Sequence, residues 1–137
     1  QALVKEMRQQ MKGAVIFRHE DRHIFGVPDI SCTWGGITSW WEVKFANPSL
    51  KITNIQVLTC KKLSREGSVC GVIIYQVYRR AETTSSRVIN PLNLKSTSPA
   101  HSPNPWNVLG VEIMYPGFDH FRLARYIKGE HQNAVDG

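Results

Sequence analysis

Apolar side chains near the start of the chain first recur at helical spacing and then form a short run. Residues 2–12 carry Leu3, Met7 and Met11 on one face of a helix, a stripe suited to packing on a sheet. Residues 14–17, in the order Ala-Val-Ile-Phe, are apolar throughout and predict a short buried strand. The pattern therefore predicts a helix followed by a strand.

Two segments rich in β-branched and aromatic residues follow, and two glycines separate them. Residues 29–34 and 37–45 predict strands, and Gly35-Gly36 is a two-residue hairpin signal. If the two glycines form the turn, the numbers of paired residues add up to 71, and Asp29 lies opposite Glu42. Directly opposed residues share one face of a sheet, with Cβ atoms about 4.5–5.5 Å apart. The hairpin is therefore expected to bring two carboxylates together.

The middle of the chain predicts a helix and then a central strand. Thr53 and Gln56 have the spacing of a capping box, and Gly67 is placed to end the helix. The apolar residues expected on its buried face are Ile55, Leu58 and Leu63. Residues 69–78 are almost continuously apolar, as expected for a strand that is covered on both faces.

The last third of the chain is more polar at first. Residues 81–105 are dominated by Ser, Thr, Asn and Pro and predict a long loop. Residues 108–115 predict a strand, and Asp119 caps a final helix over residues 120–128. We expect an α/β fold, a mixed central sheet flanked by helices, in a single domain over residues 1–137.

Length and charge narrow the choice of function. The chain has 137 residues, which suits one domain, and its 17 Lys and Arg exceed its 11 Asp and Glu, giving a formal net charge of +6. This balance favours an anionic partner such as nucleic acid. With 42% hydrophobic and 20% charged residues, the composition is not that of a disordered chain.

Neither a membrane segment nor a cysteine scaffold is predicted. The longest apolar run, over residues 72–75, is far shorter than the roughly 20 residues of a spanning helix. The first residues lack the pattern of a secretory signal, which favours a location inside the cell. Cys32, Cys60 and Cys70 have no CxxC spacing and are expected to be free, mostly buried thiols.

The paired carboxylates point to specific chemistry. Lys44 lies two residues beyond Glu42 and therefore faces the same side of the sheet as Glu42 and Asp29. Two opposed like charges are destabilising unless a cation lies between them. Mg²⁺, which prefers oxygen ligands, is one such cation. The alternative is a solvated strand face on which Lys44 pairs with both carboxylates.

These residues also carry a family resemblance. The segment Gly26-Val27-Pro28-Asp29, followed by Glu42-Val43-Lys44, resembles the PD-(D/E)xK nuclease superfamily, whose pattern is a Pro-Asp, a short β-hairpin and an acidic-x-Lys tripeptide. The charged run over residues 18–22 and the helix with Gln56 before an apolar strand are similar to the VRR-NUC branch, which includes stand-alone phage nucleases. The resemblance covers about residues 3–78 and implies a restriction-endonuclease-like core.

The resemblance also implies roles for individual residues. Asp29 and Glu42 would be direct metal ligands, with the main-chain carbonyl of Val43 as a third, and the metal would be Mg²⁺ or Mn²⁺. Lys44 would orient or activate the attacking water and stabilise charge on the phosphate. Because an unperturbed lysine has a pKa of about 10.4, the electrostatic role is favoured. Glu6, on the first helix, matches the acidic residue with which such enzymes also hold the metal, or else is an ordinary exposed helical glutamate.

Two further positions allow alternatives. The family places a glutamine near the active site, whereas the capping box would use the Gln56 side chain to cap the helix; we expect Gln56 at the active site. Trp40 and Trp41 alternate faces, so that one packs in the core while the other faces substrate or a dimer partner.

The sequence therefore predicts a Mg²⁺- or Mn²⁺-dependent deoxyribonuclease. Small members of this branch resemble Holliday junction resolvases, so an endonuclease acting on branched or structured DNA as a homodimer is the preferred reading. It would act in the cytoplasm, or in the host cytoplasm for a phage-encoded form. The alternatives are a nuclease-like fold that binds nucleic acid without cutting it, and a dimeric scaffold whose carboxylates merely pair with Lys44.

Overall fold

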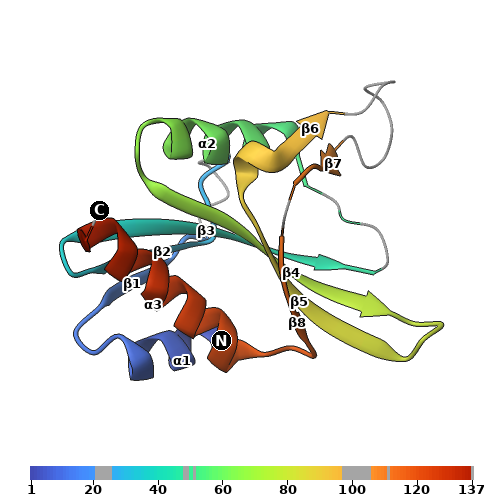
Figure 1. Ribbon diagram of the computed structural model, residues 1–137, viewed down its shortest axis with the longest axis horizontal. Coiled ribbons are helices and arrows are strands. Elements are labelled where there is room, and N and C mark those ends of the chain that lie inside the picture. Colours follow the sequence, from blue (N-terminus) through green and yellow to red (C-terminus); the bar gives the residue numbers. More distant parts are fainter. Residues whose placement is uncertain (21–25, 48–49, 51, 97–105, 111, 137) are drawn as a thin grey trace.

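The computed structural model describes residues 1–20, 26–47, 50, 52–96, 106–110 and 112–136 (Figure 1). In chain order its elements are α1 (Ala2–Gln10), β1 (Val15–Arg18), β2 (Ile30–Trp34), β3 (Ile37–Ala46), α2 (Asn54–Arg65), β4 (Val69–Tyr78), β5 (Thr83–Ile89), the 3-10 turn η1 (Pro91–Asn93), β6 (Leu94–Ser96), β7 (Trp106–Val108), β8 (Ile113–Pro116) and α3 (His120–Asp136).

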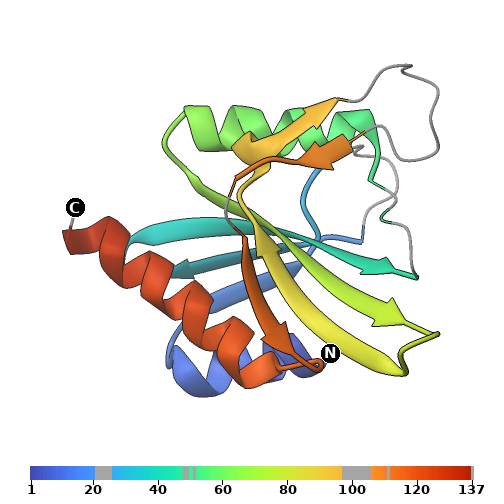
Figure 2. The same ribbon diagram turned by 45° about the vertical axis from the view of Figure 1, so that its right-hand side comes forward.

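A mixed sheet forms the middle layer of the molecule. Its strand order is β1-β2-β3-β4-β5-β8, and β6 and β7 form a separate two-stranded ladder. The β3–β4 pair is parallel and the other pairs are antiparallel. Helix α2 forms the crossover between the two parallel strands and covers one face, and α1 and α3 cover the other (Figures 1 and 2). The expected α/β fold with a mixed sheet flanked by helices is confirmed.

The apolar run of β4 contributes to the core on both sides of the sheet. Ile73 packs with residues of α1 and α3, such as Met7 and Leu123. Val72 and Ile74 point the other way and pack with Val57 of α2. A strand covered on both faces must be apolar at successive positions, which explains why this segment shows no alternation.

The β2–β3 hairpin has the predicted register. Trp34 pairs with Ile37 around the two glycines, both of which have positive φ. The ladder ends at the Ile30–Trp41 pair, one step before Asp29 would meet Glu42. Asp29 therefore lies at the point where the two strands separate.

The predicted long loop over residues 81–105 is wrong for residues 83–96. Residues 83–89 form β5, which pairs with β4 on one side and β8 on the other. The Ser86 hydroxyl donates to the carbonyl of Gly117. Because such partners satisfy small hydroxyl side chains inside a sheet, a Ser- and Thr-rich segment can occupy an interior strand. Residues 97–105 lie outside the described part of the chain.

Three predicted boundaries or faces also differ from the structure. The strand expected over residues 108–115 is divided into β7 and β8, and α3 continues to Asp136. On α2, Val57 and Cys60 are buried, whereas Ile55 and Leu58, which we expected in the core, are exposed. Val57 and Cys60 are three residues apart and share the helix face that packs on the sheet, whereas Ile55 and Leu58, also three residues apart, share an exposed face.

The first strand is less buried than its apolar run predicts. Ile16 is buried in β1, whereas Val15 and Phe17 are exposed. β1 is an edge strand, and its residues alternate between the covered and the open face of the sheet. The three cysteines are free, with Cys32 and Cys60 buried and Cys70 partly buried, as predicted.

Candidate active site

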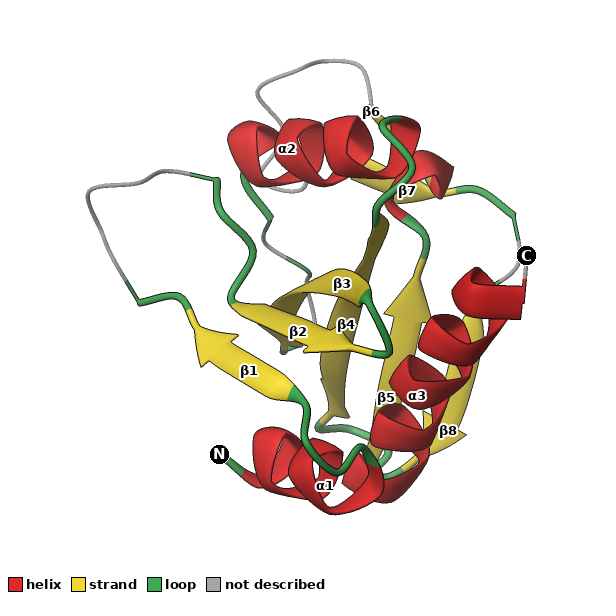
Figure 3. Cartoon of the chain, turned by 90° about the vertical axis from the view of Figure 1, so that its left-hand side faces the viewer, coloured by secondary structure: helices red, strands yellow, loops and turns green. Residues whose placement is uncertain are grey.

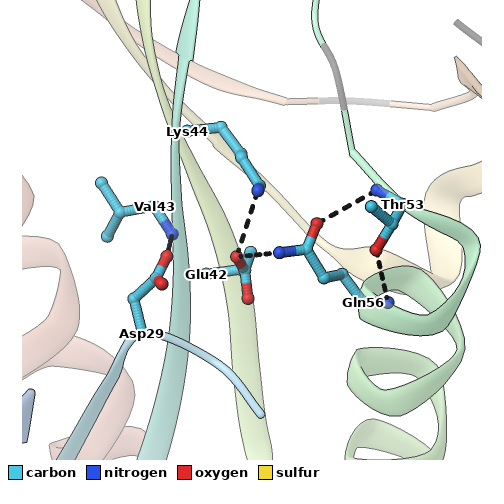
Figure 4. Close-up of polar contacts among 6 residues, drawn as sticks. All are labelled: Asp29, Glu42, Val43, Lys44, Thr53 and Gln56. Atoms are coloured by element: carbon cyan, nitrogen blue, oxygen red, sulfur yellow. Dashed lines mark hydrogen bonds and ion pairs between the residues drawn. The ribbon is translucent and has the colours of Figure 1, made fainter. Parts of the chain in front are cut away.

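Strands β2 and β3 lie side by side in the sheet (Figure 3), and Asp29 contacts β3 just beyond the end of their ladder (Figure 4). The Oδ2 atom of Asp29 accepts a 2.7 Å hydrogen bond from the backbone N–H of Val43. This bond reaches across the gap at the end of the ladder and fixes the Asp29 side chain against β3. The Asp29 carboxyl also lies near enough to that of Glu42 for a hydrogen bond between the two groups, which helps to raise the pKa of Glu42.

Glu42 is fully buried on the α2 side of β3. Its Oε1 atom accepts a 3.0 Å hydrogen bond from Nε2 of Gln56 and lies 3.5 Å from Nζ of Lys44. Its Oε2 atom is also buried, and no N–H or O–H donor among the described residues reaches it while both carboxylates are ionised. A buried carboxylate oxygen without a partner is costly, so this atom is the feature of the site that most needs a ligand.

Burial and charge alter the acidity of Glu42. Removal from water and, to a lesser extent, the negative charge of Asp29 raise the pKa of Glu42 to about 8, and the Lys44 ammonium opposes this rise. The carboxyl therefore holds its proton at neutral pH unless a further positive charge is supplied.

The Gln56 side chain makes both the cap contact and the contact toward Glu42. Its Oε1 atom accepts from the backbone N–H of Thr53, and its backbone N–H donates to Oγ1 of Thr53, which completes the capping box. Its Nε2 atom is directed the other way and donates to Glu42 (Figure 4). The expected conflict between cap and site does not arise, because the two ends of the amide are separate donor and acceptor groups.

Lys44 lies on the same face as Glu42, as the alternation of β3 predicts. Its side chain is mostly buried, and its ammonium group is the positive charge nearest to Glu42 in the described contacts. The structure therefore brings together Asp29, Glu42, Val43, Lys44 and Gln56.

Glu6 has different contacts. Its Oε1 atom accepts a hydrogen bond from Nε2 of Gln10, and that amide also donates to the carbonyl of Phe121 at the start of α3. A cavity of about 220 Å³ beside Asp29 is lined from the N-terminus by Gln1 and not by Glu6. The described hydrogen bond of Glu6 therefore lies within α1, Gln10 makes the link to α3, and the role of Glu6 at the site stays a prediction.

The donor set suits a hard divalent cation. Asp29 and Glu42 supply carboxylate oxygens, and the Val43 carbonyl adds a neutral oxygen on the same strand. Within the described residues, no group of three or more His, Cys, Asp and Glu side chains is arranged to hold a metal. A site with two carboxylates fits Mg²⁺, which usually keeps several waters. The unpartnered Oε2 of Glu42 is the observation that favours a cation here.

The alternating tryptophans are now assigned to faces. Trp41 is buried in the core under α1 and α3, and Trp40 lies on the side of Glu42. The Trp40 ring stacks on that of His19, with 5.5 Å between centroids and 27° between planes. From the sequence, His19 could be either a strand-end contribution to this face or part of a solvated turn, and the structure places its ring on this face, directly after β1. Residues 21–25, which include the rest of the charged run, lie outside the described part of the chain.

Comparison with known proteins identifies a related fold. No family model matches the sequence, and no curated protein matches it. The 1.6 Å structure of Hjc from Archaeoglobus fulgidus, described as a Holliday junction resolvase from an archaeal hyperthermophile, matches with a TM-score of 0.51. The match has 16% sequence identity and covers 88% of this chain and 90% of that chain. The chain therefore has a restriction-endonuclease-like fold.

Proposed function

We propose that this chain is a metal-dependent deoxyribonuclease of the PD-(D/E)xK superfamily, in its VRR-NUC-like branch. The observation that carries the proposal is the buried Glu42 carboxyl, with one unpartnered oxygen, beside Asp29 and Lys44. A buried acid of this kind has little structural value by itself, because burial makes its charged form unfavourable. It is well suited to holding a cation.

Asp29, Glu42 and the carbonyl of Val43 would hold Mg²⁺ or Mn²⁺, and Glu6 is the further acidic residue proposed for this role. When bound, the metal would polarise the phosphate and lower the pKa of a water molecule. The hydrogen bond from Val43 to Asp29 orients one carboxylate. The bond from Gln56 to Oε1 of Glu42 orients the other.

Lys44 has an electrostatic role in this proposal. Its ammonium lies near the carboxylates and can stabilise negative charge that develops on the phosphate as water attacks phosphorus in line. Gln56 is a positioning residue, because its described contacts are with Glu42 and Thr53.

Branched DNA is the proposed substrate and a homodimer the proposed assembly. The fold match to a Holliday junction resolvase supports this choice, together with the excess of Lys and Arg in the chain. A symmetric dimer would present two sites to the two equivalent strands of a four-way junction. Such an enzyme would act inside the cell, where its DNA substrate is found. No helix within the described residues is long and apolar enough to cross a bilayer.

A cleavage panel tests the proposal. The chain is incubated with linear, flapped and four-way DNA in Mg²⁺ and in Mn²⁺, beside Asp29→Asn and the control Glu66→Gln, which alters an exposed carboxylate at the end of α2. We expect symmetric incisions in the junction by the wild type and the control, and none by Asp29→Asn. Cutting only from DNA ends would overturn the resolvase assignment. Binding without cleavage in either metal would instead establish the non-catalytic binding module.

A further inference from the structure

The open face of β1, β2 and β3 carries a row of aromatic rings. Phe17 pairs with Ser31, and Ser31 pairs with Trp40, so the three side chains project from the same face of the sheet. Trp40 and Glu42 are two residues apart on β3 and share this face, about 7 Å apart along the strand. The row therefore leads directly to the buried carboxylate.

The His19 ring lies between the rings of Phe17 and Trp40. Ser31 is small, and its Oγ forms a 2.8 Å hydrogen bond with Nε2 of His19, which holds the imidazole over β2. The imidazole stacks on Trp40 and lies 6.4 Å from the Phe17 ring, centroid to centroid. The backbone N–H of His19 also donates to the carbonyl of Asp29 over 2.7 Å. Hydrogen bonds of His19 therefore connect the row both to Ser31 of β2 and to Asp29 of the candidate site.

The outer end of the row is open to solvent. Phe17 is 60% exposed, although a phenylalanine in a strand is usually covered. Helix α2 packs over β3 and β4, and its described contacts leave Phe17 accessible. Beside Phe17 on this face are Thr33 and Thr38, whose hydroxyls hydrogen-bond to each other at an exposed position. The exposed part of this face therefore carries the Phe17 ring beside threonine hydroxyls and the side chain of Val15.

We propose that Phe17, His19 and Trp40 form a stacking platform for an unpaired nucleobase of the DNA strand that enters the active site. This inference rests on the proposed nuclease function and specifies its substrate as DNA with unpaired nucleotides next to the cut. Bases inside a duplex are stacked on their neighbours, so an exposed aromatic face can engage a base only where the strand is unpaired. The hydrogen bond of His19 to Ser31 and its stacking on Trp40 hold these two rings in a fixed orientation relative to Glu42.

Binding without metal tests the platform separately from cleavage. The full chain is titrated in EDTA against a single strand of about 15 nucleotides that carries a central 2-aminopurine, and against the same strand in a duplex. We expect quenching of 2-aminopurine in the single strand. Phe17→Ala is expected to weaken single-strand binding about fivefold or more and duplex binding less than twofold, and Phe17→Tyr to retain it.

Phe121→Ala is the matched control, because Phe121 is 56% exposed and lies on α3. It is expected to bind both DNAs as the wild type does. A second variant, Trp40→Leu, keeps an apolar side chain and removes the aromatic face; it should also lose the quenching. The platform is overturned if quenching is absent, or if Phe17→Ala changes single-strand and duplex binding equally. If the wild type cleaves no DNA, the proposed nuclease function is refuted, whereas these binding results still decide whether the platform exists.

Discussion

Replacing Glu42 by glutamine tests the central electrostatic argument. The variant Glu42→Gln keeps an acceptor for Gln56 Nε2 and removes the buried ionisable group. In the folded wild type, burial raises the pKa of Glu42 from 4.5 to about 8. Between these two pH values the unfolded chain loses the proton that the folded chain retains, so the free energy of unfolding falls as pH rises and the loss is complete above pH 8.

The size of the effect follows from the same shift. A pKa change of this extent corresponds to roughly 5 kcal/mol at most over the whole window, and to about 2 to 3 kcal/mol between pH 5 and pH 7. Urea denaturation in EDTA, followed by circular dichroism from pH 5 to pH 8, measures it. As pH rises from 5 to 7, we expect the free energy of unfolding of the wild type to fall by this amount relative to that of Glu42→Gln.

Adding Mg²⁺ or Mn²⁺ provides the second half of the test. A bound cation stabilises the wild type by about 2.7 kcal/mol at one hundred times its dissociation constant, and the variant should gain far less. Glu66→Gln, at an exposed position, should follow the wild type throughout. Parallel pH profiles for wild type and Glu42→Gln would refute the argument from burial.

Four other substitutions test the site and the packing of the sheet. Lys44→Ala is expected to slow DNA cleavage by about 100-fold or more while metal-induced stabilisation, measured by thermal shift, is kept; unchanged cleavage would exclude the electrostatic role. Gln56→Ala should lower the free energy of unfolding in urea by about 1 kcal/mol and slow DNA cleavage roughly 10- to 100-fold. Thr53→Ala should lower the free energy of unfolding by a similar amount and slow cleavage less. Gly71→Ala should destabilise the chain by about 1 to 3 kcal/mol, because an added Cβ would overlap the Trp41 ring; a wild-type melting temperature would show that the ring can move.

Local rules predicted the hairpin and the cap well. The pair Gly35-Gly36 sets the β2–β3 register, and the distance from that turn places Glu42 and Lys44 on one face. The capping box at Thr53 is set by contacts within a single turn. Such features depend on residues that are near each other in sequence, so they could be predicted without knowledge of the fold.

Features that depend on distant partners were missed. Composition alone could not show that β5 would be an interior strand, because its pairing with β4 and β8 comes from other parts of the chain. The exposure of Phe17 follows from the position of β1 at the edge of the sheet. The Gln10 amide that donates to Glu6 also reaches the Phe121 carbonyl of α3, a contact that depends on how the two helices meet, and neither bond supports the predicted metal role of Glu6.

The Gln56 amide links the proposed metal site to the first turn of α2, because its two ends contact Glu42 and Thr53. The first turn of a helix can unfold locally at low cost, and here that opening would also withdraw the hydrogen bond that orients Glu42. By reciprocity, any cation held by Glu42 must stabilise the closed turn. Hydrogen exchange at the Val57 amide, which donates to the Thr53 carbonyl, would then slow when metal is added, making a backbone amide outside the ligand set a reporter of site occupancy.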